Sequence, residues 1–393
     1  MNRKQTIFGG ILLILFFASS FAFGQLLPED PAKGARLFVS KGCVRCHALK
    51  GEGGKVGPDF GRVDVGDTQL DLAAKLWNHI PSMILGMERP RIIKPTLTGQ
   101  EFTEISAYLY FLKFFDEPGD PTRGRLVFNE KGCGTCHSLS GKGAEGEPGL
   151  DEFPQNLSPV FLSQVIWNHG SVMIARMVKL GMKWPEFKGT EMMDLLEYIK
   201  MHAKGGSKEA AFITPGNPKE GKQIFTAKGC LKCHAIRGEG GKGGEDLGKK
   251  AKTFYKSLTQ IASSMWNKGP TVLAKMGQTQ SGIPKFTPKE MADLLAYLYF
   301  LHFVDEPGNP TNGKKTFSEL GCSRCHGLDG KPGELMNINL AKYQKAVNPM
   351  EIVAGIWNHS TEIERAMKEK GISWPRFKKG EMADLLEFVR TKK

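Results

Sequence analysis

Apolar residues recur at helical spacing in four separate segments of the chain. In one segment, Met291 is followed by leucines at positions 294, 295 and 298, which is the spacing of a helix that buries one face. Thr287 stands before a first-turn proline and three residues before a glutamate, as in a capping box that begins a helix. Glycine-rich loops such as "GEGGKGGED" lie between such segments. The pattern predicts a mostly helical protein.

The helical segments belong to four copies of one sequence unit. Each copy contains a Cys-x-x-Cys-His motif, with a glycine nine residues and a phenylalanine five residues before its first cysteine, and a Trp-Asn pair after it. The motifs begin 90, 97 and 92 residues apart, which suits one small domain per copy. The sequence therefore predicts four tandem domains and one glycine- and lysine-rich linker, at residues 29–117, 118–205, 206–214 (the linker), 215–306 and 307–393.

The four copies fall into two types. Copies 1 and 3 end in the long aromatic segments "AYLYFLKFFDEPGDP" and "AYLYFLHFVDEPGNP", whereas copies 2 and 4 stop at "LLEYIK" and "LLEFVR". The duplicated unit is therefore a pair of domains, and the fold class predicted is mostly α, with four helical domains in two di-domain pairs.

The N-terminus predicts export from the cytoplasm. Residues 1–24 combine basic Arg3 and Lys4 with an apolar run that ends in small residues, as a signal peptide does. An uncleaved anchor is the alternative, because the run is close to the minimum for a membrane span. The location expected is the periplasm, either free or anchored facing it.

The Cys-x-x-Cys-His motif uses all eight cysteines and four of the nine histidines of the chain. A zinc site would need its second ligand pair near by, and a redox disulfide needs no following histidine. Covalent haem attachment uses both thiols and the histidine. We therefore expect four covalently bound haem c groups, tethered by the cysteines and bound proximally by the histidines: Cys43, Cys46, His47; Cys133, Cys136, His137; Cys230, Cys233, His234; Cys322, Cys325, His326.

Each copy resembles a class I c-type cytochrome domain, and the resemblance extends over residues 29–393. It rests on the Gly and Phe before the motif, on the motif itself, and on last helices of the "EMADLLAYL" kind. It implies that the first and last helices cross through that Gly and Phe against an aromatic residue of the last helix, here Tyr108, Tyr198, Tyr297 and Phe388.

The sequence departs from this family at the sixth iron ligand. The family places a methionine just before the proline that precedes the last helix, whereas this pre-proline column holds Lys94, Trp184, Ile283 and Trp374. Ten residues after each Trp-Asn tryptophan stands another methionine. We predict that this methionine column provides the distal ligands: Met87, Met177, Met276 and Met367.

Two alternatives to the methionine column stay open. Met83 and Met173 lie one turn earlier on the same helical face, in copies 1 and 2 only. His79, His169 and His359 follow the Trp-Asn pairs, but Lys268 occupies that position in copy 3. We expect these histidines near haem or at the surface. The Trp-Asn tryptophans are expected to pack against haem, with burial in the core as the alternative.

The long aromatic ends lead to a hypothesis about domain contacts. Their aromatic residues would pack against the following domain and bring haems 1 and 2, and haems 3 and 4, close together; burial within their own domain is the alternative. The residues concerned are Tyr110, Phe111, Phe114, Phe115, Tyr299, Phe300 and Phe303.

Together these features predict a tetrahaem cytochrome that carries single electrons and is not an enzyme. The charge of +13 favours acidic redox proteins as partners, although the haem propionates would offset about eight charges. No nucleic-acid partner is expected, and membrane association would come only through the N-terminus. The main alternative is a multihaem oxidoreductase, of the peroxidase or small-anion reductase kind, with one open haem. A photosynthetic reaction-centre subunit and a cytochrome polymer are further alternatives.

Overall fold

The computed structural model describes most of the chain, including all four Cys-x-x-Cys-His motifs. The predicted signal peptide and linker lie outside the described residues, as does Phe115. Within the described part, no helix is long and apolar enough to cross a membrane. The described residues are 27–28, 31–88, 91–114, 116–141, 144, 147–155, 157–204, 216–249, 257–278, 282–328, 331–333, 335–336, 338–340 and 348–391.

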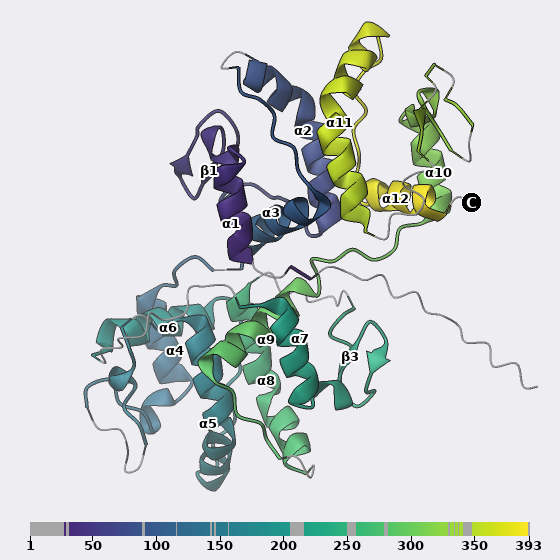
Figure 1. Ribbon diagram of the computed structural model, residues 1–393. Coiled ribbons are helices and arrows are strands. Elements are labelled where there is room, and N and C mark those ends of the chain that lie inside the picture. Colours follow the sequence, from purple (N-terminus) through teal and green to yellow (C-terminus); the bar gives the residue numbers. More distant parts are fainter. Residues whose placement is uncertain are drawn as a thin grey trace, which may run out of the picture.

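Each copy builds the same three helices, which confirms the mostly helical fold class (Figure 1). Short 3₁₀ turns follow the first helix at every motif, and the only strands in the described residues are two-residue pieces in the loops. In order, the helices are α1 (Pro31–Ser40), α2 (Gln69–Glu88), α3 (Gly99–Phe111); α4 (Pro121–Glu130), α5 (Pro159–Lys179), α6 (Glu191–His202); α7 (Pro218–Ala227), α8 (Leu258–Gly277), α9 (Pro288–Phe300); and α10 (Pro310–Glu319), α11 (Pro349–Glu369), α12 (Glu381–Thr391).

Three of the copies carry a two-residue strand pair after the motif. β1 (Ala48–Leu49) pairs with β2 (Glu52–Gly53), and β3 (Ala235–Ile236) with β4 (Glu239–Gly240), in antiparallel register. In copy 4, β5 (His326–Gly327) pairs with β6 (Ile338–Asn339) in parallel. The loop of copy 4 therefore leaves its histidine by a different path.

The first and last helices of each copy cross at a glycine, as the family resemblance implied. A Cβ on Gly34 would collide with the carbonyl oxygen of Glu104, and the matching glycines of the other copies meet α6, α9 and α12 in the same way. Beside the crossing, the ring of Phe38 lies 6.5 Å from that of Tyr108. The equivalent aromatic pairs are Phe128–Tyr198, Phe225–Tyr297 and Phe317–Phe388. Only glycine allows the two backbones to approach so closely.

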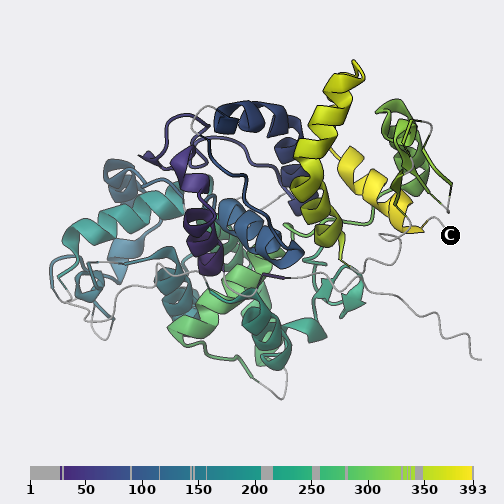
Figure 2. The ribbon, with the colours of Figure 1, turned by 45° about the horizontal axis from the view of Figure 1, so that its top comes forward.

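The four copies assemble into two lobes that do not follow the order of the chain. Copies 1 and 4 form one lobe, in which α2 and α3 pack on α11 and α12, and copies 2 and 3 form the other, in which α5 packs on α8 and α9 (Figure 1). After the turn of Figure 2, the yellow α11 still lies beside the blue α2. The hypothesis that copy 1 pairs with copy 2, and copy 3 with copy 4, is therefore wrong.

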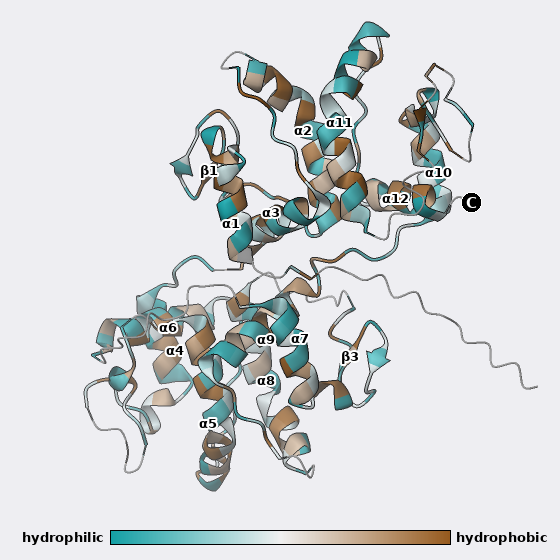
Figure 3. Cartoon of the chain, in the orientation of Figure 1, coloured by the Kyte–Doolittle hydropathy of each residue, from teal (hydrophilic) through white to brown (hydrophobic). Residues whose placement is uncertain are grey.

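A single apolar core runs through both copies of the 1/4 lobe. Buried residues of α2, such as Ile80 and Ile84, belong to the same cluster as Val353 and Trp357 of α11 and Leu386 of α12. Each helix carries hydrophobic as well as hydrophilic residues (Figure 3). Copies 1 and 4 therefore bury apolar surface against each other and stabilise one another.

The Trp-Asn pairs hold the copies of each lobe together. Trp77 donates its indole N–H to the carbonyl of Pro375 at 2.8 Å, and Asn78 exchanges two hydrogen bonds with the backbone of Phe377. The contact is reciprocal, because Trp357 and Asn358 of copy 4 bind the backbone of Pro95 and Leu97 in copy 1. In the 2/3 lobe, the same bonds join Trp167–Pro284, Asn168–Phe286, Trp266–Pro185 and Asn267–Phe187.

The pre-proline column serves the same interface. Trp374 stacks on Trp77 with ring centroids 4.2 Å apart and donates to its carbonyl oxygen. Trp184 does the same to Trp266 at 4.3 Å. In copy 1, the ammonium of Lys94 takes over the donor role and binds the carbonyl of Trp357. In copies 1, 2 and 4, the column that lacks the family's methionine is thus occupied by residues that join two domains.

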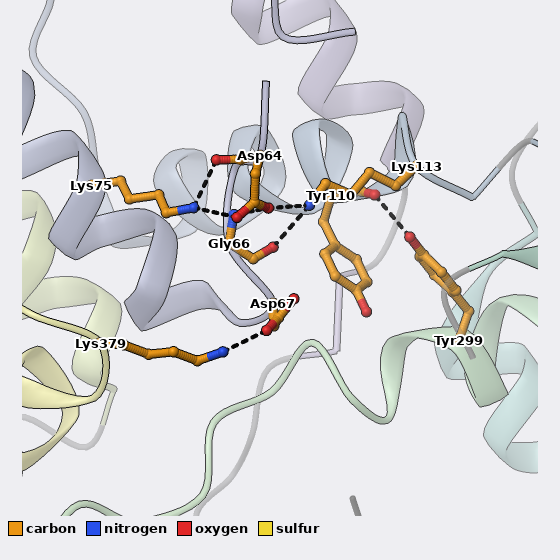
Figure 4. A network of polar contacts seen from close by, with 8 residues as sticks. All are labelled: Asp64, Gly66, Asp67, Lys75, Tyr110, Lys113, Tyr299 and Lys379. Carbon is orange, nitrogen blue, oxygen red and sulfur yellow. Dashed lines mark hydrogen bonds and ion pairs between the residues drawn. The ribbon is translucent and has the colours of Figure 1, made fainter. Parts of the chain in front are cut away.

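The two lobes meet through the long aromatic ends of copies 1 and 3. The rings of Tyr110 and Tyr299 lie 4.7 Å apart, and the Tyr299 hydroxyl donates to the Tyr110 carbonyl at 3.0 Å (Figure 4). Phe114 packs on Tyr299, and Phe111 faces Phe300. The aromatic ends of copies 1 and 3 therefore pack on each other, in a cluster that also includes Val160 of copy 2.

Each of these ends also caps the middle helix of the other copy. Asp116 accepts a hydrogen bond from the backbone N–H of Thr259 in the first turn of α8, and Asp305 accepts one from Leu70 in the first turn of α2. A carboxylate at a helix N-terminus satisfies an unpaired N–H and interacts favourably with the helix dipole. The "DEPG" sequences thus fix the contact between the lobes.

Ion pairs surround this junction. Lys113 and Lys75 hold the pKa of Asp64 well below its usual value, and Lys379 of copy 4 binds Asp67 of copy 1 at 2.7 Å (Figure 4). The Asp67–Lys379 pair is largely exposed to solvent, so its contribution to stability is small.

Replacing Trp374 by alanine is expected to destabilise the 1/4 lobe alone. The change removes a ring stack and an indole hydrogen bond, a loss of about 3–5 kcal/mol for a large aromatic residue. Calorimetry of the full chain should show one lobe unfolding at a lower temperature. Trp184→Ala is the matched control, which should lower the other transition; an equal shift of both transitions by either variant would contradict the lobe assignment.

The contact between the lobes should weaken in alkaline solution. Burial raises the pKa of Tyr299 well above its ordinary value of 10.0, so above about pH 10 the unfolded chain loses this proton while the folded chain keeps it. Stability is then lost at about 1.4 kcal/mol per pH unit for this group. Chemical denaturation of wild type and Tyr299→Phe between pH 9 and 11 tests this, and the variant should show a shallower loss; identical slopes would contradict it.

Candidate haem sites

The Cys-x-x-Cys-His motif forms a tight turn in every copy. The glycine before it takes a left-handed conformation, with φ of 78°, 72°, 81° and 76° in copies 1 to 4. The backbone N–H of His47 then bonds to the carbonyl of Cys43 at 3.0 Å, and the turns of copies 2 and 3 repeat this bond. The turn brings two thiols and one imidazole to the same side of a slot between the helices.

The cysteines form no disulfides. Burial raises the pKa of the first thiol of each pair, to about 11 for Cys133, Cys230 and Cys322, so these thiols are not reactive thiolates. Among the described residues, no three metal-binding side chains gather into a site of their own. The turns therefore fit neither a disulfide framework nor a zinc site.

The proximal histidines of copies 1 to 3 are oriented by a backbone carbonyl eleven residues further on. The Nδ1 of His47 lies 3.0 Å from Pro58 O, that of His137 3.0 Å from Pro148 O, and that of His234 2.9 Å from Glu245 O. A carbonyl at this distance keeps the proton on Nδ1 and leaves Nε2 free to bind iron.

Copy 4 differs in this respect. The Nδ1 of His326 is buried and has no hydrogen-bond partner among the described residues, and burial lowers the pKa of its ring. Its backbone instead belongs to the parallel pair with Ile338. Within the described residues, the ring of His326, the proximal histidine predicted for copy 4, thus lacks the carbonyl contact that orients the histidines of copies 1 to 3.

Cavities lie beside the motifs of copies 1 and 3, with volumes of about 440 and 390 Å³. In copy 1, one wall carries Cys43, Cys46 and His47, and the opposite wall is one face of α2 from Leu72 to Met87. The lining is mainly apolar. Such a slot suits a flat apolar ring held by two thioethers and one imidazole.

Tryptophans of the partner domain complete these slots. Trp357 of copy 4 lines the slot of copy 1, Trp167 of copy 2 lines that of copy 3, and Trp266 of copy 3 lines that of copy 2. These three tryptophans therefore line the slot of another copy, and their packing against haem stays a prediction. No sequence signal indicated which copy this would be.

The methionine column lies at the distal walls in three copies. Met87, Met177 and Met276 line the slots of copies 1, 2 and 3, and Met83 and Met173 line the first two beside them. Met367 lies in the last turns of α11. The structure thus brings the predicted column and its first alternative to the same walls, and the choice of ligand stays a prediction.

Histidines face the proximal rings in copies 1 and 2. The ring of His79 lies 6.1 Å from that of His47, and the ring of His169 lies 6.3 Å from that of His137. Burial lowers the pKa of both His79 and His169, which favours the neutral, iron-binding form. In copy 3, Lys268 occupies this place and pairs with Glu245. His79 and His169 therefore lie beside the predicted haem sites, as expected, and the choice between histidine and methionine stays a prediction.

The turn is repeated in all four copies, and together with the oriented histidine and the apolar slot of copies 1 to 3 it defines a c-type cytochrome site. The Cytochrome c family model matches residues 31–113, 121–203, 218–301 and 310–393, so the chain belongs to the cytochrome c family and carries four covalently bound haem c groups. No curated protein and no solved structure matched the chain. Its domains are accordingly haem-based electron-transfer domains.

A change in copy 4 should alter haem 1. Trp357→Ala opens the slot of copy 1 to solvent, and water near a haem favours the charged, oxidised state. We expect the reduction potential of haem 1 to fall by an amount on the order of tens of millivolts. A redox titration that follows the haem-methyl NMR signals, assigned to each copy, measures this change. Trp266→Ala is the control and should shift haem 2 instead; a shift confined to haem 4 in Trp357→Ala would contradict the assignment.

Proposed function

We propose that the protein is a tetrahaem carrier that passes single electrons between redox partners outside the cytoplasm. The observation that carries this proposal is that a tryptophan of the partner copy lines the slot in copies 1, 2 and 3, so that the slots lie next to the contact between the two copies of a lobe. Electrons move between haems that are close together, so we propose exchange within the pairs 1–4 and 2–3. The aromatic junction of Tyr110, Tyr299 and Phe111 connects the two pairs.

The distal walls support transfer without turnover of a substrate. In copies 1 to 3, a neutral histidine or a methionine of the middle helix lines each slot or faces its proximal ring. An iron with two protein ligands is closed to peroxide, nitrite and similar molecules. In this role, the haem supplies reversible one-electron chemistry, and the chain binds it, orients the proximal imidazole and excludes water.

A multihaem oxidoreductase is the second candidate function. Its open haem would be the one in copy 3. This slot has Lys268 where copies 1 and 2 have histidine, and a cationic side chain near an open haem would attract small anions. The pairing of Lys268 with Glu245 neutralises that charge, which favours the carrier. The partners proposed are acidic redox proteins, on the basis of the net charge of +13, and the signal at residues 1–24 supports a periplasmic location.

Carbon monoxide distinguishes the two functions. The reduced full chain should bind none, because every iron keeps both protein ligands, and a redox titration should recover four one-electron steps. Haem counting on the same sample checks that all four sites are filled. Stoichiometric binding of carbon monoxide to one haem would support the oxidoreductase and overturn the carrier.

A further inference from the structure

In copy 1 and in copy 2, two histidine rings face each other at the centroid separation expected for two imidazoles bound to one iron atom. A metal–imidazole bond is about 2 Å long, and the ring centre lies about 1.1 Å behind the nitrogen, so two imidazoles on opposite sides of an iron have centroids about 6.2 Å apart. The observed separations are 6.1 Å for His47–His79 and 6.3 Å for His137–His169. The planes are inclined by 61° and 62°, which rotation about a shared axis allows.

The ring nitrogen of His169 also indicates that an iron atom lies between this histidine and His137. The Nε2 of His169 is buried and has no hydrogen-bond partner in the described part of the chain. Buried ring nitrogens are normally paired. Two nitrogens facing each other across an iron would lie about 4 Å apart, which is too far for a hydrogen bond and too close to admit a water molecule. An iron ligand is the bond that this nitrogen lacks.

The position of His79 on α2 also fits the centre of the slot. The cavity-lining face of α2 runs from Leu72 to Met87, and His79 stands midway between these two. Met87 lies eight residues further on, which is about 12 Å along the helix axis. The two residues therefore do not compete for the same point above the ring, and His79 is the one opposite His47.

Copy 3 provides the contrast. Lys268 replaces the histidine, and its ammonium pairs with Glu245, the residue whose backbone carbonyl binds the proximal His234. Lys268 and Glu245 both line the slot of copy 3, and their pairing occupies the ammonium group. The predicted methionine of this copy, Met276, lines the slot.

We propose that distal ligation is not uniform: His79 binds haem 1, His169 binds haem 2, and Met276 binds haem 3. This assignment takes the place of Met87 and Met177 and rests on the proposed carrier function. Methionine favours reduced iron relative to a second histidine. Haem 3 therefore has a higher potential than haem 2, its partner in the 2/3 lobe, and electrons collect on it.

The test compares His79→Ala with Met87→Leu in the full, haem-loaded chain. His79→Ala should convert one haem in four to the high-spin form and allow one equivalent of carbon monoxide to bind after reduction. Met87→Leu should leave both properties unchanged. The reverse result would restore the methionine assignment and overturn this one.

A second variant, His79→Met, keeps the test valid if His79→Ala causes the protein to lose haem 1. His79→Met keeps a ligand at the same place, so the far-red methionine-to-iron charge-transfer band should gain the intensity of one haem, and one of the four potentials should rise. Met276→Leu should remove the intensity of one haem from that band, whereas Met177→Leu should not change it. An unchanged band in both His79→Met and Met276→Leu would overturn the proposal.

The wild-type protein separates this inference from the carrier function. If wild type binds carbon monoxide, the carrier proposal fails whatever the variants show. If wild type binds none and Met87→Leu opens haem 1, the carrier survives and the histidine assignment alone fails.

Discussion

The arrangement of the whole molecule depends on one exchange of hydrogen bonds. The segment between the middle and last helices of each copy, for example Pro95–Leu97, has no helix or strand to pair its backbone, and buried carbonyls need donors. A tryptophan and an asparagine from another copy supply them. Because each copy both gives and receives these bonds, the contact closes on itself, and two copies form one lobe.

The same exchange explains why the sixth-ligand position of the family changed its role. With the middle helix extended along the slot, side chains of that helix face the haem, and the pre-proline residue is free to face the neighbouring domain. Trp184 and Trp374 use this freedom to stack on the tryptophans they also bind. The chain from the middle helix to the pre-proline residue thus lines the slot at one end and contacts the neighbouring domain at the other.

The local features could be predicted from the sequence, and the long-range ones could not. Helical periodicity, the glycine crossings and the Cys-x-x-Cys-His turns each depend on residues within one copy, so a single copy contains the information. The Trp-Asn pair is present in all four copies and can bind the proline segment of any other. The contact between the lobes also depends on the aromatic ends and on the capping carboxylates Asp116 and Asp305, whose partners lie more than 140 residues away along the chain.

The two lobes are nested along the chain, because copies 2 and 3, which form one lobe, lie between copies 1 and 4, which form the other. The inner lobe can close once the third domain has been made, whereas the first domain must wait for the last, because Trp357 and Trp374 come from the C-terminal copy. Until then, the first slot lacks Trp357, which lines it in the complete lobe. During synthesis, the lobe of copies 2 and 3 can therefore form before the lobe of copies 1 and 4. Copy 1 is synthesised first, but it is among the last copies to gain its partner.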